Sequence, residues 1–167
     1  MEKTKLNLGC GKDIKEGYVN VDSVKLSGVD VIQELSDYPW KFKDNEFDEV
    51  YARFILEHLP DNIKVMEEIW RISKPGAIIK IWVPHFSSDY CWGDIQHMRG
   101  YTLISFDIFL ESCPYNFYNK CHFKINKKQY NGRRLYRFLK ILNLHNIALR
   151  YLNNIGGILY FELEVVK

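Results

Sequence analysis

The sequence lacks the features that mark several classes of protein. No apolar run approaches the ~20 residues that a membrane-spanning helix needs, and the chain opens on charged residues rather than on an apolar signal region. The four cysteines form no Cys-x-x-Cys pair and have no zinc-finger spacing, which argues against a disulfide framework and a structural metal. We therefore expect a cytoplasmic protein with reduced thiols and no membrane span.

Acidic residues are missing from a long stretch of the C-terminal part. Residues 1–111 carry 13 Lys or Arg against 19 Asp or Glu, whereas residues 112–167 carry 10 against 2. The basic residues between Ser112 and Phe161 are Lys120, Lys124, Lys127, Lys128, Arg133, Arg134, Arg137, Lys140 and Arg150. Such a segment could attract a phosphate-bearing substrate or a nucleic acid. The overall isoelectric point is not strongly basic, so a solvated basic face without a partner is the favoured interpretation.

What is present suits one compact domain. Hydrophobic residues make up 47% of the 167 residues, enough to build a core, and domains of ~100 to 150 residues are the commonest size. We expect a single domain over residues 1–167, as a monomer or a homodimer.

A short apolar run that ends in two glycines stands near the start of the chain. Leu6 and Leu8 alternate as in a β-strand, and Gly9 and Gly11 follow them. A Gly-x-Gly turn at the carboxyl end of a strand lets the backbone approach a ligand closely, and ligands of open α/β sheets bind at these ends. A tight turn without a ligand is the alternative.

Strands and helical segments alternate along the rest of the chain. The patterns predict strands over residues 5–8, 18–22, 29–33, 47–53, 77–83, 122–126 and 158–166, and helices over 63–74, near 103–111 and within 134–152. The run at 77–83 is nearly all apolar, as expected of a strand covered on both faces. We predict an α/β fold with a doubly wound, mostly parallel sheet and an antiparallel C-terminal strand. The aromatic-rich residues 85–120 are interpreted as an insertion that covers the substrate.

A carboxylate stands at the end of the second predicted strand. Asp22 follows Gly9 by thirteen residues, and neighbouring parallel strands bring their carboxyl ends together. Its side chain can accept hydrogen bonds from both hydroxyls of a ribose, or it can begin a turn. A dinucleotide fingerprint would need a third glycine at Ile14 and an acid about 20 residues on. Both are missing, which disfavours a nicotinamide or flavin cofactor.

Five motifs in order give the chain a family resemblance. They are Leu6-Asn-Leu-Gly-Cys-Gly11, Val19-Asn-Val-Asp22, Phe47-Asp-Glu-Val-Tyr51, Leu56-Glu-His-Leu59 and Lys74-Pro-Gly76. Together they resemble the motifs of class I S-adenosylmethionine-dependent methyltransferases, and most closely the type 11 methyltransferase group. The resemblance implies a Rossmann-like methyltransferase fold and S-adenosylmethionine as the cofactor, with S-adenosylhomocysteine as its product.

The resemblance also implies roles for eight residues. Gly9, Cys10 and Gly11 would lie against the methionine part of the cofactor, and Asp22 would hold the ribose. Glu34 and Leu35 would lie beside the adenine, and Arg53 and Phe54 near the transferring methyl group. The chain departs from the family at two of these positions, because Glu34 stands where Asp is more usual and Phe54 where related sequences often have His.

Methyl transfer mainly requires that the acceptor be aligned with the sulfonium. A general base helps when the acceptor is a hydroxyl, and the candidates are His85, His97 and Asp94. A loop histidine that caps backbone groups is the alternative for His85, and His58 is interpreted as structural. Because no ligand spacing links Asp94, His97 and their polar neighbours, we expect no metal.

The resemblance therefore predicts a methyltransferase that acts on a small-molecule acceptor, with a hydroxyl oxygen as the favoured acceptor atom and nitrogen or carbon as alternatives. Ala52-Arg53-Phe54 does not match the Pro-Pro-aromatic motif common in enzymes that methylate nucleic-acid bases. Two alternatives remain: a non-catalytic module of the same fold that binds S-adenosylmethionine or a protein partner, and an RNA methyltransferase that uses the basic C-terminal part.

Overall fold

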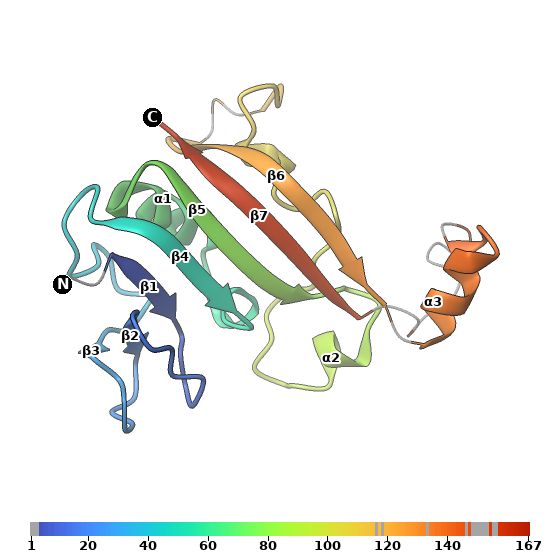
Figure 1. Ribbon diagram of the computed structural model, residues 1–167, viewed down its shortest axis with the longest axis horizontal. Coiled ribbons are helices and arrows are strands. Elements are labelled where there is room, and N and C mark those ends of the chain that lie inside the picture. Colours follow the sequence, from blue (N-terminus) through green and yellow to red (C-terminus); the bar gives the residue numbers. More distant parts are fainter. Residues whose placement is uncertain are drawn as a thin grey trace.

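A seven-stranded mixed sheet forms the centre of the molecule (Figure 1). The computed structural model describes residues 4–115, 117, 119–132, 134–145, 147, 154 and 157–167. Arg133 and Arg150 of the basic C-terminal part lie outside the described residues. Much of the helix predicted within residues 134–152 also lies outside them, after residue 145.

The strands follow the order β3-β2-β1-β4-β5-β7-β6. They are β1 (Lys5–Leu8), β2 (Val19–Asp22), β3 (Val31–Ile32), β4 (Phe47–Arg53), β5 (Ser73–Pro84), β6 (His122–Asn131) and β7 (Ile158–Val166). Strands β1 to β5 pair in parallel, and β7 runs antiparallel to both of its neighbours. The predicted α/β sheet with an antiparallel C-terminal strand is confirmed, and the chain winds outward from β1 in both directions.

The core lies on one face of this sheet. Strand side chains such as Val50, Ile79 and Phe161 are fully buried there, against Met66 and Ile69 of helix α1 (Asn62–Ile72). Along β7 the burial alternates strictly between buried and half-buried residues. A single buried face explains this alternation, since successive side chains of a strand point to opposite sides.

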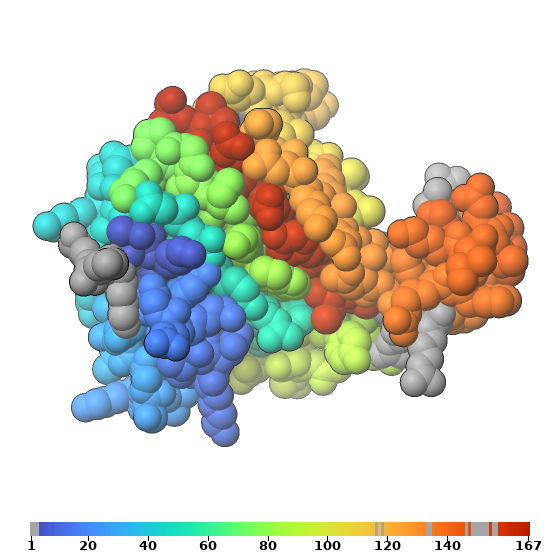
Figure 2. Space-filling model, viewed as in Figure 1, coloured from blue at the N-terminus to red at the C-terminus, as the bar shows by residue number. Residues whose placement is uncertain are grey.

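The opposite face of the sheet is only partly covered, so the expectation that β5 is buried on both faces is wrong. Within β5, the side chains of Ile78, Lys80 and Trp82 are half-buried. The residues that alternate with them, Ile79, Ile81 and Val83, are buried. Trp82 lies between Tyr51 and Tyr160, with ring centroids 4.6 Å apart on each side. Figure 2 shows the strands at the surface on this side. The aromatic row shields the backbone that a helical layer would otherwise cover.

The link between β1 and β2 explains why this face lacks a helix near its edge. Only residues 9–18 connect the two strands, and the structure has turns there instead of a crossover helix. The buried Asn7 amide donates to the carbonyl of Asp13 (2.7 Å) and to Asn20 Oδ1 (2.9 Å), and Lys15 N donates to the same oxygen (2.9 Å). These bonds fold the short link back against the sheet.

Helix α1 begins and ends at identifiable residues. Asp61 caps its first turn by accepting a hydrogen bond from Lys64 N at 3.1 Å. The helix ends at Ile72 and β5 begins at the next residue, so Pro75 and Gly76 lie within the strand rather than closing the helix as predicted. The ending comes earlier because Ser73 adopts an extended conformation and pairs with Phe47 of β4.

The remaining helical elements are short. They are η1 (Leu56–His58), α2 (Asp89–Trp92), η2 (Asp107–Phe109) and α3 (Arg134–Ile141), which projects away from the sheet (Figure 1). Only η2 occupies the region where a helix was predicted near residues 103–111. No helix in the described part of the chain is long and apolar enough to cross a membrane.

The aromatic-rich residues 85–120 serve the core as well as the surface. Phe106 packs on Phe161 of β7 (ring centroids 4.7 Å apart), and Phe109 packs on Phe123 of β6 (6.0 Å). Both side chains are nearly fully buried. This segment therefore covers the core face of the last two strands, whereas its first part, around α2, lies at the carboxyl ends of the parallel strands.

Candidate active site

The glycine turn lies where the sequence places it, directly after β1. Gly9 has φ +61°, a conformation that side-chain-bearing residues rarely adopt. A Cβ at Gly9 would also stand 2.4 Å from Ile55 Cγ1. Glycine is therefore required at this position both by the backbone and by the close approach of the segment that follows β4.

Asp22 ties this turn to the end of β2. One carboxylate oxygen accepts a hydrogen bond from Gly11 N (2.8 Å), and the other accepts one from Val24 N (3.1 Å). Both interpretations of Asp22 are thus compatible, since the side chain begins a turn and also faces the glycine turn. Each oxygen keeps a second lone pair with which it can accept a hydrogen bond from a ligand hydroxyl.

Cys10, between the two glycines, has a buried and unreactive thiol. Its side chain is buried, and burial together with the nearby Asp22 carboxylate raises the pKa of the thiol to about 11. A thiol with such a pKa is protonated at neutral pH and is a poor nucleophile. The structure supports its interpretation as a small residue in the turn.

Glu34 and Leu35 lie beside a narrow hollow at this edge of the sheet. The hollow has a volume of about 40 Å³, and its walls come from Gly9, Asp22, Ser23, Gln33, Glu34, Leu35, Ile55 and Leu59. Leu35 is buried, whereas Glu34 is exposed and accepts hydrogen bonds from Ser36 N and Oγ (3.2 and 2.8 Å). Binding sites for small molecules usually hold ~300 Å³ or more, so a nucleoside would lie largely over this hollow rather than inside it.

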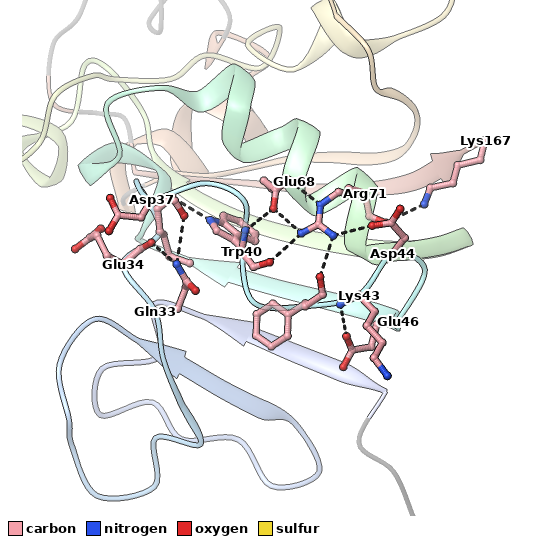
Figure 3. Close-up of polar contacts among 12 residues, drawn as sticks. Gln33, Glu34, Asp37, Trp40, Lys43, Asp44, Glu46, Glu68, Arg71 and Lys167 are labelled. Atoms are coloured by element: carbon pink, nitrogen blue, oxygen red, sulfur yellow. Dashed lines mark hydrogen bonds and ion pairs between the residues drawn. The ribbon is translucent and has the colours of Figure 1, made fainter.

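A polar network fastens the loop that carries these residues to helix α1 (Figure 3). The Arg71 guanidinium donates to both carboxylate oxygens of Glu68 (2.8 and 2.7 Å) and to the carbonyls of Phe42 and Trp40 (2.9 and 3.1 Å). Trp40 in turn donates through Nε1 to the Leu35 carbonyl at 3.1 Å. The side of the hollow formed by Leu35 is thereby held by α1.

Arg53 and Phe54 lie at the end of β4, and their side chains have different neighbours. Arg53 is exposed and lies 3.8 Å from Asp13 of the β1–β2 link. Phe54 has φ +55°, which is unusual for a bulky residue. Strained backbone of this kind tends to cluster at functional sites.

A larger cavity opens beside Phe54. Its volume is about 530 Å³, within the range of small-molecule sites. Its walls are formed by Phe54, Glu57, His58, Pro84, Asp89, Tyr90, Gly93, Asp94, His97 and Ile158. A third hollow shares Phe54, His58 and His97 with this cavity and Ile55 with the hollow at the glycine turn. Residues Phe54 to Leu59 thus form a continuous wall between the two.

The structure brings two of the three candidate bases into this cavity. His97 Nε2 lies 3.9 Å from Asp94 Oδ2, and His97 Nδ1 lies 2.7 Å from the Cys91 carbonyl oxygen. His85 follows Pro84 of the cavity wall, but its buried ring packs on Phe86 and Tyr130. Burial lowers the pKa of His85 to about 4, so this imidazole is neutral at physiological pH.

The basic C-terminal part is partly neutralised where the structure describes it. Lys124 lies 3.5 Å from Glu164, and Lys128 pairs with Asp107. Ion pairs of this kind are expected of a solvated basic face without a partner, the interpretation that the sequence favoured.

Comparisons with known proteins agree with this geometry. Residues 7–81 match a family model described as a methyltransferase domain, of the type 11 group. The match spans 75 of the 167 residues, a little less than half of the chain, and it makes the chain similar to this family over that region. The matched region begins in β1 and reaches into β5, and so contains the glycine turn, Asp22 and the Phe54–Leu59 wall.

Individual relatives are similar to this chain over short stretches. A sterol 24-C-methyltransferase of Aspergillus fumigatus is 37% identical over 59 residues, which are 35% of this chain and 16% of the relative. A demethylmenaquinone methyltransferase of Lactiplantibacillus plantarum is 41% identical over 54 residues, 27% of this chain and 23% of the relative. The chain thus spans less than a quarter of each of these curated relatives.

Similarity of fold extends over nearly the whole chain. A crystal structure of a SAM-dependent methyltransferase from Archaeoglobus fulgidus superposes with a TM-score of 0.66 and 16% identity. The match covers 96% of this chain and 85% of that one.

Sequence reasoning missed several residues of the candidate site. Gln33, Ile55 and Leu59 line the hollow at the glycine turn, and Glu57 and His58 line the large cavity. For Glu57, His58 and Leu59 the signal that could have found them is the Leu56-Glu-His-Leu59 motif, which was used only as a mark of the family. Its polar pair faces a cavity because η1 turns there between β4 and α1.

Proposed function

We propose that this protein is a methyltransferase, which binds S-adenosylmethionine over the glycine turn and transfers its methyl group to a hydroxyl oxygen of a small-molecule acceptor in the 530 Å³ cavity. The observation that carries the proposal is the wall Phe54–Leu59, which separates the hollow at Gly9 and Asp22 from that cavity. A methyl donor in the hollow and a methyl acceptor in the cavity would lie on opposite sides of this wall. They could come into contact where the wall ends.

The cofactor-binding part rests on the edge formed by β1, β2 and β4. Asp22 offers its free lone pairs to the ribose hydroxyls, and the open space beside Gly11, where a Cβ would meet nothing within 4 Å, leaves room for the methionine part. Leu35 offers an apolar surface and Glu34 a polar group beside the adenine. Arg53 and Phe54 would stand near the sulfonium.

The acceptor part rests on the cavity's mixture of apolar and titratable groups. His97 and Asp94 face the space where an acceptor hydroxyl would lie, and one of them would receive its proton as the new oxygen–carbon bond forms. His85 could take this role only after a rearrangement that exposes its ring. Because alignment dominates methyl transfer, the walls of the cavity contribute more than any single base.

The test is a pair of measurements on the intact chain. Calorimetry should show one S-adenosylhomocysteine bound per chain, and release of S-adenosylhomocysteine should accompany methylation of a member of a panel of hydroxyl-bearing small molecules. Tight nucleoside binding with no turnover on any acceptor would favour a non-catalytic module. Turnover on RNA that Lys124→Glu and Lys128→Glu reduce would favour the basic C-terminal part instead.

A further inference from the structure

Three side chains that could hold a metal ion meet in the wall of the large cavity. Glu57, His58 and His97 each offer a ligand atom, and these atoms all lie within 4.8 Å of one another. Glu57 and His58 belong to η1, directly after β4, whereas His97 comes from the loop after α2. Met98 N donates to the Glu57 carbonyl at 2.8 Å, so a backbone hydrogen bond holds the two segments together.

The carboxylate of Glu57 is the unusual member of this group. The residue is 0% exposed, and neither carboxylate oxygen has a hydrogen-bond partner among the residues that the structure describes. A buried charge without a partner is costly, and buried carboxylates are normally paired or bound to metals. Both carboxylate oxygens are thus available as ligands for a cation.

The two histidines are arranged as metal ligands usually are. His97 Nδ1 donates to the Cys91 carbonyl at 2.7 Å, which leaves the lone pair of Nε2 free. Hydrogen bonds from the second ring nitrogen to a carbonyl are typical of histidines that bind metals. The His58 ring lies 4.5 Å from the His97 ring, nearly perpendicular to it.

We propose that Glu57, His58 and His97 bind one divalent transition-metal ion of the zinc type, in the wall of the acceptor cavity. Two imidazoles and one carboxylate suit such ions, whereas Mg²⁺ prefers oxygen ligands. Ligands at ~2.1 Å in a tetrahedral site are roughly 3.4 Å apart, so modest side-chain movements would bring the three atoms into range.

Three protein ligands leave a position for a fourth, and all three residues line the same cavity. The fourth ligand would be a water molecule or an oxygen of the acceptor, and Asp94 would then be the base, because Nε2 of His97 would be bound to the metal. The metal site itself does not depend on methyl transfer. Its use in orienting an acceptor hydroxyl rests on the proposed function.

The test measures Zn²⁺ and Co²⁺ binding to the intact chain after treatment with a chelator and dialysis. The wild type should bind one equivalent of Zn²⁺, and Co²⁺ should give the visible absorption bands of a four- or five-coordinate site. Glu57→Gln and His97→Gln should each weaken Zn²⁺ binding by at least tenfold and abolish the Co²⁺ bands. His122→Gln, a partly buried histidine on β6, is the matched control and should bind like the wild type.

Thermal unfolding separates loss of metal from loss of structure. With chelator at pH 8, Glu57→Gln should unfold no earlier than the wild type, because it removes a buried charge. With excess Zn²⁺ the wild type should gain stability and Glu57→Gln should not. Absence of binding, or Zn²⁺ affinity that neither variant changes, would overturn the proposal. Calorimetry with S-adenosylhomocysteine, which tests the proposed function, can succeed or fail independently of these results.

Discussion

At the scale of single residues, Asp22 combines two tasks. It accepts hydrogen bonds from Gly11 N and Val24 N, so it shapes the glycine turn while it faces the proposed ribose site. Phe54, by contrast, is held in a left-handed conformation at the end of β4. Both residues end strands, where a parallel sheet presents its backbone and side chains to a ligand.

Replacement of Asp22 tests the cofactor assignment. Asp22→Ala should weaken S-adenosylhomocysteine binding by about 1.5 to 3 kcal/mol, because it removes a charged acceptor of hydrogen bonds. Calorimetry measures the affinity, and thermal unfolding shows whether the glycine turn has loosened as well. Asp48→Ala is the control, since Asp48 is an exposed acid on β4 that pairs with Lys74. An affinity equal to that of the wild type would contradict the assignment.

His85 should make the protein sensitive to acid. Its pKa is lowered from 6.5 to about 4 by burial, so the folded state favours the neutral ring. The stability from this residue is present above pH 6.5 and is lost as the pH falls to about 4, by about 3 kcal/mol in total. Urea unfolding across this range should show a smaller loss in His85→Gln. If the free energy of unfolding fell equally with pH in the wild type and in His85→Gln, His85 would not be the cause of the acid sensitivity.

At the scale of elements, the link from β4 to α1 organises the site. Residues Phe54 to Leu59 approach Gly9 on one side and His97 on the other. Helix α1 follows at once and holds the loop with Trp40 through Arg71 and Glu68. The position of one helix thus determines the walls of both the hollow and the cavity.

The Arg71 network should contribute measurably to stability. Arg71→Lys keeps the charge but loses the paired hydrogen bonds to Glu68 and those to the carbonyls of Phe42 and Trp40. We expect a loss of about 1 to 3 kcal/mol in the free energy of unfolding. Lys74→Ala removes an exposed ion pair with Asp48 and should cost ~1 kcal/mol at most. Equal effects of the two substitutions in urea unfolding would contradict this account.

At the scale of the whole molecule, the sheet has one core face and one partly open face. Phe106, Phe109 and helix α1 cover the first, whereas the row Tyr51, Trp82 and Tyr160 shields the second. The edge formed by β3 contains only two residues, which are half-buried and exposed. Stability should therefore be unevenly distributed over the sheet.

Amide hydrogen exchange can measure this distribution. The central strands β5 and β7 should exchange most slowly, because each is paired on both sides and carries fully buried side chains such as Ile81 and Phe161. Val31 and Ile32 of β3 should exchange fastest among the strand residues. Mass spectrometry of peptides from the three strands provides the comparison, and uniform protection would contradict it.

The sequence by itself determined the fold class, and it indicated the edge of the sheet at which we propose that the cofactor binds. Alternating apolar residues, Gly9 and Asp22 are local signals, since each depends on a few neighbouring residues. The family motifs extended these signals from β1 into β5. The sequence did not reveal that β5 has one half-open face, because an apolar run alone cannot show whether helices cover both sides.

Only the tertiary structure decided which polar residues meet. His97 lies beside Glu57 and His58 because the loop after α2 returns to η1 and Met98 N bonds to the Glu57 carbonyl. His85, which was also a candidate base in the sequence, packs its ring on Tyr130 instead. Contacts between residues far apart in the chain depend on how long segments close over the sheet, and no local pattern of residue types specifies that closure.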